Sequence, residues 1–258
     1  LDGYTLNPGD LSWEQLQSLG DVVVHEHSTA EQVIERAQGA QVLLTNKTPI
    51  PRQTLDQLPD VRYIGVLATG FNIVDVEAAR ERDIPVCNVP TYGTASVAQA
   101  AIAHMLNLTQ RIGDHAVAVA NNRWSECRDF SFRDYPLIEL EGLTFGVIGL
   151  GRIGRRTAEL AHAFGMSILA HTRTPDPSLD WAEFVDVDEL LGRSDVVSLH
   201  CPLTPETEGI IDARRLGLMK PTALLVNTSR GPLIDEQALR TALEAGTIAG
   251  ASLDVMGV

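Results

Sequence analysis

Residues 143–154, LTFGVIGLGRIG, decide the fold of this chain. The stretch opens with a short apolar run, residues 144–148, which predicts a buried β-strand, and a helical pattern follows its last glycine. Gly149 permits the tight turn out of the strand, Gly151 lets a diphosphate approach the backbone, and Gly154 allows the helix to pack closely on the strand. Three glycines between a strand and a helix therefore predict a dinucleotide-binding turn rather than a glycine-rich turn without a ligand.

The first residues of the predicted helix supply the other half of this site. Backbone amides at a helix start have no partner within the helix, and the helix dipole favours an anion there. We expect the amides from Arg152 and Ile153 onward to face the phosphates of the dinucleotide.

Short apolar runs alternate with helical patterns along the rest of the chain, which predicts an α/β fold built from right-handed βαβ units. Several runs are continuously apolar, as expected for parallel strands that are buried on both faces. The predicted strands are residues 21–24, 41–45, 63–67, 86–88, 144–148, 167–170, 196–200, 223–227 and 250–253. The predicted helices are residues 12–18, 29–37, 73–81, 96–111, 152–164, 187–191 and 236–245.

Composition limits the possible functions. The 258 residues carry 34 Asp and Glu against 20 Lys and Arg, a formal net charge of −14 at pH 7. An acidic chain without a Lys/Arg-rich run does not suit nucleic-acid binding, and it fits a protein with small ligands. Cys87, Cys127 and Cys201 form no CxxC pair, so neither a disulfide framework nor a metal site is indicated. No apolar stretch is long enough to span a bilayer, and we expect a cytoplasmic protein without membrane contact.

A turn within residues 92–96 separates one α/β block from a long predicted helix. We expect residues 1–92 to form a substrate domain and residues 93–258 to form a dinucleotide-binding domain, with a cleft between the two lobes. Residues 113–141 interrupt the second block, because they are polar, lack a clear period and contain four aromatic residues. The segment is either an arm between subunits, which predicts a homodimer, or a long surface loop.

The residues after the strand that follows the glycines bear on the choice between NAD and NADP. An acid about 20 residues beyond the glycines would bond the ribose 2′-hydroxyl and repel a 2′-phosphate. The sequence here is AHTRT at residues 170–174, without Asp or Glu. Thr172 can bond a ribose or phosphate oxygen and Arg173 can pair with a 2′-phosphate, which favours NADP or the use of both cofactors. If Arg173 is instead a solvated surface charge, NAD would bind through hydroxyl contacts alone.

Further motifs follow one another in order along the chain. They are VLATGFN at residues 66–72, NVP at 88–90 followed by SVA at 96–98, the glycine turn at 149–154, HCPLT at 200–204 and VNTSRG at 226–231. With these motifs, which span nearly the whole sequence, the chain resembles the D-isomer-specific 2-hydroxyacid dehydrogenase family and, within it, the glycerate dehydrogenase/hydroxypyruvate reductase branch.

The resemblance implies a Rossmann-type, doubly wound parallel-sheet domain and a smaller, flavodoxin-like α/β substrate domain. It also implies an NAD(P)-dependent oxidoreductase that transfers a hydride between nicotinamide and C2 of a small D-2-hydroxy or 2-oxo acid, of the glycerate/hydroxypyruvate or glyoxylate type. Because a fold does not settle a function, two alternatives stay open. One is a dinucleotide-sensing regulator or corepressor, and the other is a formate- or phosphite-type dehydrogenase.

The same resemblance assigns roles to residues on two loops. Ala68, Thr69 and Gly70 would lie on a loop whose amides bind the substrate carboxylate, with Thr69 also near the nicotinamide. A short glycine-containing loop after a strand can form an anion nest, although without the resemblance an ordinary turn is the simpler interpretation. Cys201 and Pro202 follow a predicted strand at its carboxyl end, where ligands bind in open α/β sheets, and would line the cofactor site.

Arg230 is the principal catalytic candidate. It follows the predicted strand 223–227, and its guanidinium can bind the carboxylate and α-oxygen of a 2-oxo acid and stabilise the alkoxide charge that develops. A surface arginine at a strand end is the plain alternative. Thr228 and Ser229 are candidate cofactor contacts, and Asp254 matches the acid that the family places near the nicotinamide carboxamide.

The sequence departs from the family's pattern after Asp254. The family places there a Glu and then the His that exchanges the hydroxyl proton, whereas residues 255–258 contain neither. None of the seven histidines stands in that context. His104 fits the apolar period of its predicted helix, and His200 is a strand-end residue that shapes the cofactor site. Carbonyl reduction needs a proton donor, so we expect a further C-terminal stretch that carries the Glu and the His.

Overall fold

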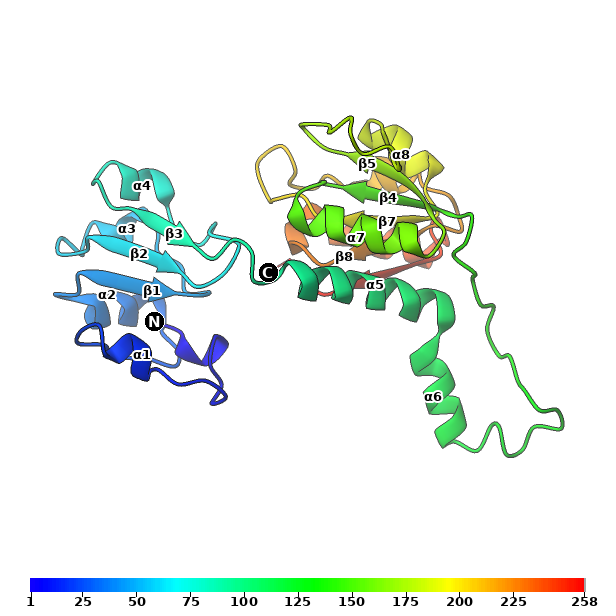
Figure 1. Cartoon of the computed structure of the whole chain (residues 1–258), viewed down its shortest axis with the longest axis horizontal. Coiled ribbons are helices and arrows are strands. Elements are labelled where there is room, and N and C mark those ends of the chain that lie inside the picture. The colour runs from blue at the N-terminus through cyan, green and yellow to red at the C-terminus, as the bar shows by residue number, and fades with distance from the viewer. Residues whose placement is uncertain (258) are drawn as a thin grey trace. The chain divides into compact units, whose positions relative to one another are not determined.

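A computed structural model describes residues 1–257, and the chain forms two compact units, Leu1–Gly93 and Thr94–Val258. Each unit is built around one parallel β-sheet with helices against it (Figure 1). The last residue of the predicted domain 93–258, Val258, lies outside the described residues. No helix within residues 1–257 has both the length and the apolar character needed to cross a membrane.

The first unit, which we call unit 1, has a three-stranded sheet in the order β1-β2-β3. Its strands are β1 (Val42–Thr45), β2 (Tyr63–Val66) and β3 (Val86–Asn88). Its helices are α1 (Glu14–Gln17), α2 (Ala30–Ala37), α3 (Arg52–Leu55) and α4 (Val76–Arg80), and a short 3₁₀ turn spans Gly3–Thr5. The apolar core of this unit joins the strands to α2, α3 and α4.

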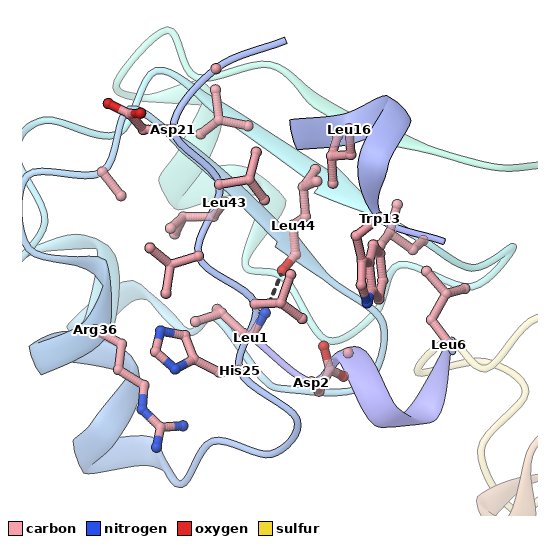
Figure 2. A pocket seen from close by; sticks show the side chains of 18 of the residues that line it. Leu1, Asp2, Leu6, Trp13, Leu16, Asp21, His25, Arg36, Leu43 and Leu44 are labelled. Carbon is pink, nitrogen blue, oxygen red and sulfur yellow. Dashed lines mark hydrogen bonds between the residues drawn. The ribbon is translucent and has the colours of Figure 1, made fainter. Parts of the chain in front are cut away.

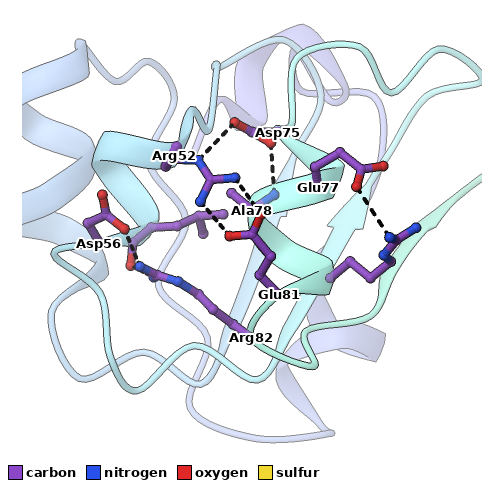
Figure 3. Close-up of polar contacts among 9 residues, drawn as sticks. Arg52, Asp56, Asp75, Glu77, Ala78, Glu81 and Arg82 are labelled. Atoms are coloured by element: carbon purple, nitrogen blue, oxygen red, sulfur yellow. Dashed lines mark hydrogen bonds and ion pairs between the residues drawn. The ribbon is translucent and has the colours of Figure 1, made fainter.

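Side chains near α3 and α4 fix both helices on the surface of unit 1 (Figure 3). Asp75 caps α4, because its carboxylate accepts a hydrogen bond from the Ala78 amide at 2.9 Å. Arg52, at the start of α3, donates two hydrogen bonds to the Glu81 carboxylate, at 2.6 and 3.0 Å. Arg82 donates one hydrogen bond to the Asp56 carboxylate and another to the Leu55 carbonyl. These exposed pairs define the local geometry and contribute little to stability.

The predicted strand at residues 21–24 is wrong. Its backbone joins no ladder, and the only nearby backbone bonds run from the Gly3 and Tyr4 amides to the carbonyls of His25 and Glu26. Val23 is 76% exposed, so the apolar run that suggested a buried strand lies largely in solvent. A strand needs a hydrogen-bonded neighbour as well as apolar side chains, and among residues 1–257 none is available to this segment.

The second unit, unit 2, has a six-stranded, fully parallel sheet in the order β6-β5-β4-β7-β8-β9. Its strands are β4 (Thr144–Ile148), β5 (Ser167–His171), β6 (Ala182–Phe184), β7 (Val196–Leu199), β8 (Leu224–Asn227) and β9 (Gly250–Leu253). Its helices are α5 (Thr94–Gln110), α6 (Ile112–Ala120), α7 (Arg152–Ala163), α8 (Val187–Arg193), α9 (Ala213–Leu216) and α10 (Glu236–Glu244), with a 3₁₀ turn at Gly231–Leu233. The predicted α/β class with a doubly wound parallel sheet is confirmed.

Two apolar layers cover the faces of this sheet. On one face, Phe145 and Val147 of β4 pack with Met105 of α5 and Ala158 of α7. On the other face, Ile148 and neighbouring strand residues pack with leucines of α8, α9 and α10. Alternate residues of each strand point to opposite layers, so the central strands are mostly apolar, although Ser198 of β7 and Asn227 of β8 are buried polar residues. This explains why several strands of unit 2 could be predicted as apolar runs.

Residues 113–141, interpreted from sequence as an arm or a long surface loop, begin within a helix, α6, that was not among the predicted helices. α6 follows α5 directly after Arg111, a non-glycine residue with φ of +49°, and the chain then runs through a long loop that projects away from the sheet (Figure 1). α6 was missed because residues 113–141 show no clear helical period, and α6 has no buried residues. Short β6, α3 and α9 were also missed, since elements of three or four residues carry too little pattern to detect.

Candidate functional site

The site forms where the strand order of unit 2 reverses, at the carboxyl ends of β4 and β7. β5 and β6 lie on one side of β4, and β7, β8 and β9 lie on the other. Backbone hydrogen bonds join the neighbouring strand ends at this point: the Gly149 amide donates to the His171 carbonyl at 2.8 Å, and the His200 amide donates to the Ile148 carbonyl at 2.8 Å. Open α/β sheets bind ligands in the crevice at such a reversal.

Each glycine of the turn has its own steric reason. Gly149 has φ of +98°, and an added Cβ would lie 2.5 Å from the Cys201 amide nitrogen. An added Cβ on Gly154 would lie 2.0 Å from the Gly149 carbonyl oxygen. At Gly151 an added Cβ would meet nothing within 4 Å. Two of the glycines are therefore required by the protein itself, whereas Gly151 faces open space that a ligand can approach.

The N-terminus of α7 offers free hydrogen-bond donors beside that space. Gly151 occupies the capping position and has no side chain that could accept from the first turn. The first intrahelical acceptor, the Gly151 carbonyl, bonds the Arg155 amide at 2.8 Å, and among residues 1–257 the amides of Arg152, Ile153 and Gly154 donate to no acceptor. A twelve-residue helix with unsatisfied first-turn amides attracts an anion such as a diphosphate.

Two buried polar atoms at the neighbouring strand ends also lack partners within the described residues. They are Nδ1 of His200, after β7, and the side-chain hydroxyl oxygen of Thr228, after β8. A native protein rarely leaves such atoms unsatisfied, so a partner from outside the chain is expected. A dinucleotide that lies along the carboxyl edge of the sheet presents hydroxyl, amide and phosphate groups there. The residues present thus fit a dinucleotide cofactor.

Burial keeps both side chains after β7 uncharged. Part of His200 reaches the surface, but its Nε2 bonds the Ser198 hydroxyl at 2.9 Å and desolvation lowers its pKa to about 4. Desolvation raises the pKa of the Cys201 thiol to about 11. At neutral pH these residues form an uncharged wall beside the glycine turn, and Cys201 is not a nucleophile.

We expect the lowered pKa of His200 to make folding stability fall in mild acid. Below about pH 6.5 the unfolded chain gains a proton at this residue, whereas the folded chain does so only near pH 4. The unfolded state then binds more protons, so up to about 3 kcal/mol of stability is lost as the pH falls through that window. Urea unfolding at pH 7 and pH 5 measures the loss, and His200→Gln is expected to lose less than the native protein. Equal losses would contradict the prediction.

Arg230 lies after β8 in an extended conformation, and the loop around it is held by the chain itself. The Asn227 amide group donates to the Arg230 carbonyl at 2.8 Å, and the Ser229 hydroxyl donates to the Leu199 carbonyl of β7 at 2.9 Å. The half-buried guanidinium donates to the Ser229 carbonyl at 2.7 Å and forms no ion pair within residues 1–257. A positioned cation without an acid partner is a suitable binding group for a carboxylate.

Asp254 ends the series of strand-end residues, after β9. Its amide donates to the Asn227 carbonyl at 2.9 Å, and its carboxylate is exposed. His104 of α5 approaches it, with 3.9 Å between Nε2 and Oδ1, and also contacts the Ser252 hydroxyl. The interpretation of His104 as a packed helix residue did not include these polar contacts of its partly exposed ring. Periodicity could not reveal this, because a histidine at an inward position looks like any other core residue.

The residues after β5 lie at the same edge. Thr172 is half-buried and Arg173 is exposed. The pKa of Glu206 lies below its usual range chiefly because of a hydrogen bond with the Thr204 side chain, and the charge of Arg173 lowers it slightly further. Arg173 is thus within electrostatic reach of the loop after β7, whose exposed Pro202 is a further candidate. Unit 2 therefore brings together all of the candidate residues that fall within it.

The loop of Ala68, Thr69 and Gly70 belongs to unit 1 and follows β2. Its backbone is fixed by the Val89 amide, which donates to the Ala68 carbonyl at 3.1 Å, and by the Asn88 side chain, which donates to the Thr69 carbonyl at 2.7 Å. The Thr69 and Gly70 amides donate to no acceptor within residues 1–257. Free adjacent amides on a fixed loop have the chemistry of an anion nest.

A cavity of about 640 Å³ lies elsewhere in unit 1 and contains none of these candidate residues (Figure 2). Leucines of β1 line one side of it, the unpaired residues 22–25 line the other, and the Leu1 amino group bonds the Leu44 carbonyl at 2.9 Å. The lining is mostly apolar, although the His25 and Arg36 side chains also belong to it. Because none of the candidate residues lines this cavity, it is not assigned to the candidate site.

Comparison with known proteins identifies the family. Residues 102–258 match the NAD-binding domain of the D-isomer specific 2-hydroxyacid dehydrogenases. A hydroxypyruvate reductase of Blautia hydrogenotrophica is 49% identical over 261 residues, which cover 99% of this chain and 81% of that protein. Two solved structures share the fold. An acyclic imino acid reductase in complex with NADPH and D-Arg is 29% identical with a TM-score of 0.88, and the match covers 96% of this chain and 80% of that one. A D-lactate dehydrogenase from Aquifex aeolicus complexed with NAD and lactic acid is 30% identical with a TM-score of 0.85, and the match covers 95% of this chain and 73% of that one.

This chain belongs to the D-isomer specific 2-hydroxyacid dehydrogenase family. The sequence-based resemblance is confirmed, as are the Rossmann-type fold and the assignment to the hydroxypyruvate reductase branch. The chain is an oxidoreductase, and its cofactor is NAD or NADP.

Proposed function

We propose that the protein reduces a small 2-oxo acid of the hydroxypyruvate or glyoxylate type to the corresponding D-2-hydroxy acid. The observation that supports this most directly is Arg230, a fixed guanidinium without an acid partner at the same strand-end edge as the glycine turn. The 49% identity to a hydroxypyruvate reductase agrees with it. The two alternatives, a dinucleotide-sensing regulator and a formate- or phosphite-type dehydrogenase, are not favoured by the named relatives.

In this proposal different residues at the carboxyl ends of the strands of unit 2 bind the cofactor and the substrate. Gly149 to Gly154 bind the diphosphate, Cys201 and Pro202 line the cofactor, and Thr228, Ser229 and Asp254 approach its nicotinamide half. The bound cofactor supplies the hydride. Arg230 holds the substrate carboxylate and stabilises negative charge on the α-oxygen. In unit 1, the substrate domain of this proposal, the adjacent free amides of Thr69 and Gly70 form a candidate anion nest of their own.

An absorbance assay tests the proposed activity. Full-length protein is mixed with hydroxypyruvate and with NADH or NADPH in turn, and the loss of absorbance of the reduced cofactor is followed. Glyoxylate and pyruvate are compared in the same assay. Formate and phosphite are tested in the opposite direction, as the rise in absorbance when NAD or NADP is reduced. Oxidation of either cofactor that depends on hydroxypyruvate or glyoxylate supports the proposal. Cofactor binding without turnover of any 2-oxo acid would overturn it in favour of a sensing role.

Arg173 is proposed to favour NADP through its 2′-phosphate. We expect Arg173→Ser to weaken NADPH binding about tenfold, because a charge-assisted bond to phosphate is lost, and to change NADH binding little. Fluorescence titration of the two reduced cofactors measures the effect. Arg80→Ser, which removes an exposed arginine of unit 1, is the matched control. Equal changes for NADH and NADPH would mean that Arg173 does not read the 2′-phosphate.

We also propose a homodimer that uses the projecting segment of α6 and residues 121–137. Its apolar side chains are unusually exposed for a single chain, with Trp124 at 54% and Phe130 at 92%, and a second copy of the same segment is the partner that would cover them. Phe130→Asp is expected to shift the mass in solution from dimer to monomer, as measured by light scattering. Leu19→Asp, at an exposed leucine of unit 1, should leave the mass unchanged. A monomeric native protein would refute the proposed homodimer.

The three free cysteines support a cytoplasmic location.

A further inference from the structure

The cavity of unit 1 is bounded on one side by the outer edge of β1. In the three-stranded sheet β1 pairs with β2 alone. The Gln41 and Thr45 carbonyls accept hydrogen bonds from amides in β2 and just after it. Because backbone groups alternate in direction along a strand, those of Val42 and Leu44 point away from β2. Both residues line the cavity, so β1 presents hydrogen-bonding groups to it.

Residues 21–24 bound the cavity on the opposite side. They take part in no backbone hydrogen bond within residues 1–257. Three of them are valines, whose β-branched side chains favour strands, and yet Val23 is 76% exposed. Apolar residues with strand composition and an unpaired backbone require a neighbouring strand.

The first residues of the chain already lie between these two stretches, at one end of the cavity. The Leu1 amino group donates to the Leu44 carbonyl at 2.9 Å, a bond drawn in Figure 2. The Asp2 carboxylate then accepts from the Asn46 amide at 2.9 Å, and the Gly3 amide donates to the His25 carbonyl at 2.8 Å. Contacts that advance in this order follow a path parallel to β1. The path leads back from Leu1 into the cavity.

The walls of the cavity suit the side chains of a strand better than a small charged ligand. Figure 2 shows the apolar side chains of Trp13 and Leu16 at one wall and Arg36 at the opposite wall. The Arg36 guanidinium already donates to the Ser28 hydroxyl at 2.8 Å and to the His27 carbonyl. A small apolar molecule could occupy the volume, but it would leave the backbone groups on both sides unpaired.

We infer that the cavity is the binding site of one further β-strand, an extended apolar stretch of polypeptide that joins Leu1 and runs parallel to β1. Its backbone pairs with Val42 and Leu44 on one side and with residues 21–24 on the other. Its side chains exclude water from the apolar lining. β1 then becomes an internal strand, and residues 21–24 become the strand that their composition predicts. The inference concerns unit 1 alone and does not rest on the proposed function.

Two lengthened forms of the full chain test this inference. Each carries about five added residues before Leu1, the usual length of a strand, made of valine and isoleucine in one form and of glycine and serine in the other. The apolar extension is expected to raise the melting temperature of unit 1 by about 5 °C or more. It should also slow amide exchange at Leu44 and residues 22–24 about tenfold or more. The glycine–serine extension should change neither, and equal effects of the two extensions would overturn the inference.

Val23→Pro tests the pairing with residues 21–24. The His25 carbonyl faces the path of residues 1–3, so by alternation the Val23 amide faces the cavity too. Without the extension this amide is unpaired, and its loss should change the melting temperature little. In the protein with the apolar extension, the same substitution should cancel most of the gain, because proline cannot donate to a ladder. An undiminished gain would contradict the proposed pairing.

The protein without an extension distinguishes the other possible occupants. Fast amide exchange at residues 22–24, independent of protein concentration, supports the inference. Exchange that slows as the protein concentration rises would assign the cavity to a second copy of the chain. An apolar molecule that is released on denaturation and detected by mass spectrometry would assign the cavity to a small ligand. Either of these last two results would overturn the inference.

Discussion

Gly149→Ala is expected to destabilise unit 2 by about 3 to 5 kcal/mol, because strain from a positive φ and a clash within a packed region add together. The new Cβ would lie 2.5 Å from the Cys201 amide nitrogen and 2.6 Å from the His200 carbonyl carbon. Both are backbone atoms of the strand end beside it and cannot rotate away. Urea unfolding followed by circular dichroism measures the loss, and cofactor binding should fall with it.

Two other glycines separate the requirements of the fold from those of the ligand. Gly20→Ala meets nothing within 4 Å and should leave both stability and cofactor binding unchanged. Gly151→Ala also meets nothing and has an ordinary φ of −74°, so the fold should tolerate it. If a diphosphate approaches this position, however, the added methyl group must weaken cofactor binding. Native stability in Gly149→Ala would show that the turn can rearrange, contrary to the expectation.

Arg230→Gln is expected to lower kcat/KM for the 2-oxo acid about a thousandfold, or about 4 kcal/mol of transition-state stabilisation. Glutamine can still donate a hydrogen bond, but it carries no charge to offset the carboxylate and the developing alkoxide. Since Arg230 contacts only the Ser229 carbonyl within the described residues, its loss leaves no buried acid unpaired. The fold and the affinity for the reduced cofactor should therefore change little.

Matched variants test whether this effect belongs to the site. Arg230→Lys keeps the charge without the planar two-pronged donor and should recover only part of the activity. Arg240→Gln removes an exposed arginine that pairs with Glu244 on α10 and should behave like the native protein. Steady-state rates with hydroxypyruvate and melting temperatures are compared across the set. Unchanged turnover in Arg230→Gln would remove this residue from the mechanism.

The sequence predicts most of unit 2 because its physics is local and repetitive. A strand buried on both faces is largely apolar, as β4 and β7 are, and the turn at Gly149 requires glycine, so each leaves a sequence signal. Residues 21–24 carry the same apolar signal without a neighbouring strand, and periodicity cannot tell the two cases apart. Pairing depends on distant parts of the chain, and for that reason the error falls there.

The candidate site shows the same division. Gly149, Arg230 and Asp254 could be placed at one sheet edge from sequence, because each follows a predicted strand and the carboxyl ends of parallel strands meet. His104 could not, since it reaches that edge from the middle of a helix. Only the packing of α5 against β9 brings its ring beside Asp254. The partnerless state of Thr228 likewise depends on its surroundings rather than on its identity.

The uncapped start of α7 has a consequence for how the protein responds to its ligand. The first-turn amides of this helix have no acceptor within the described residues, and a bound diphosphate would supply one. Binding of the diphosphate then raises the free energy of unfolding, since only the native turn can bind the anion. The free energy of unfolding of unit 2 is therefore expected to rise with the concentration of free cofactor.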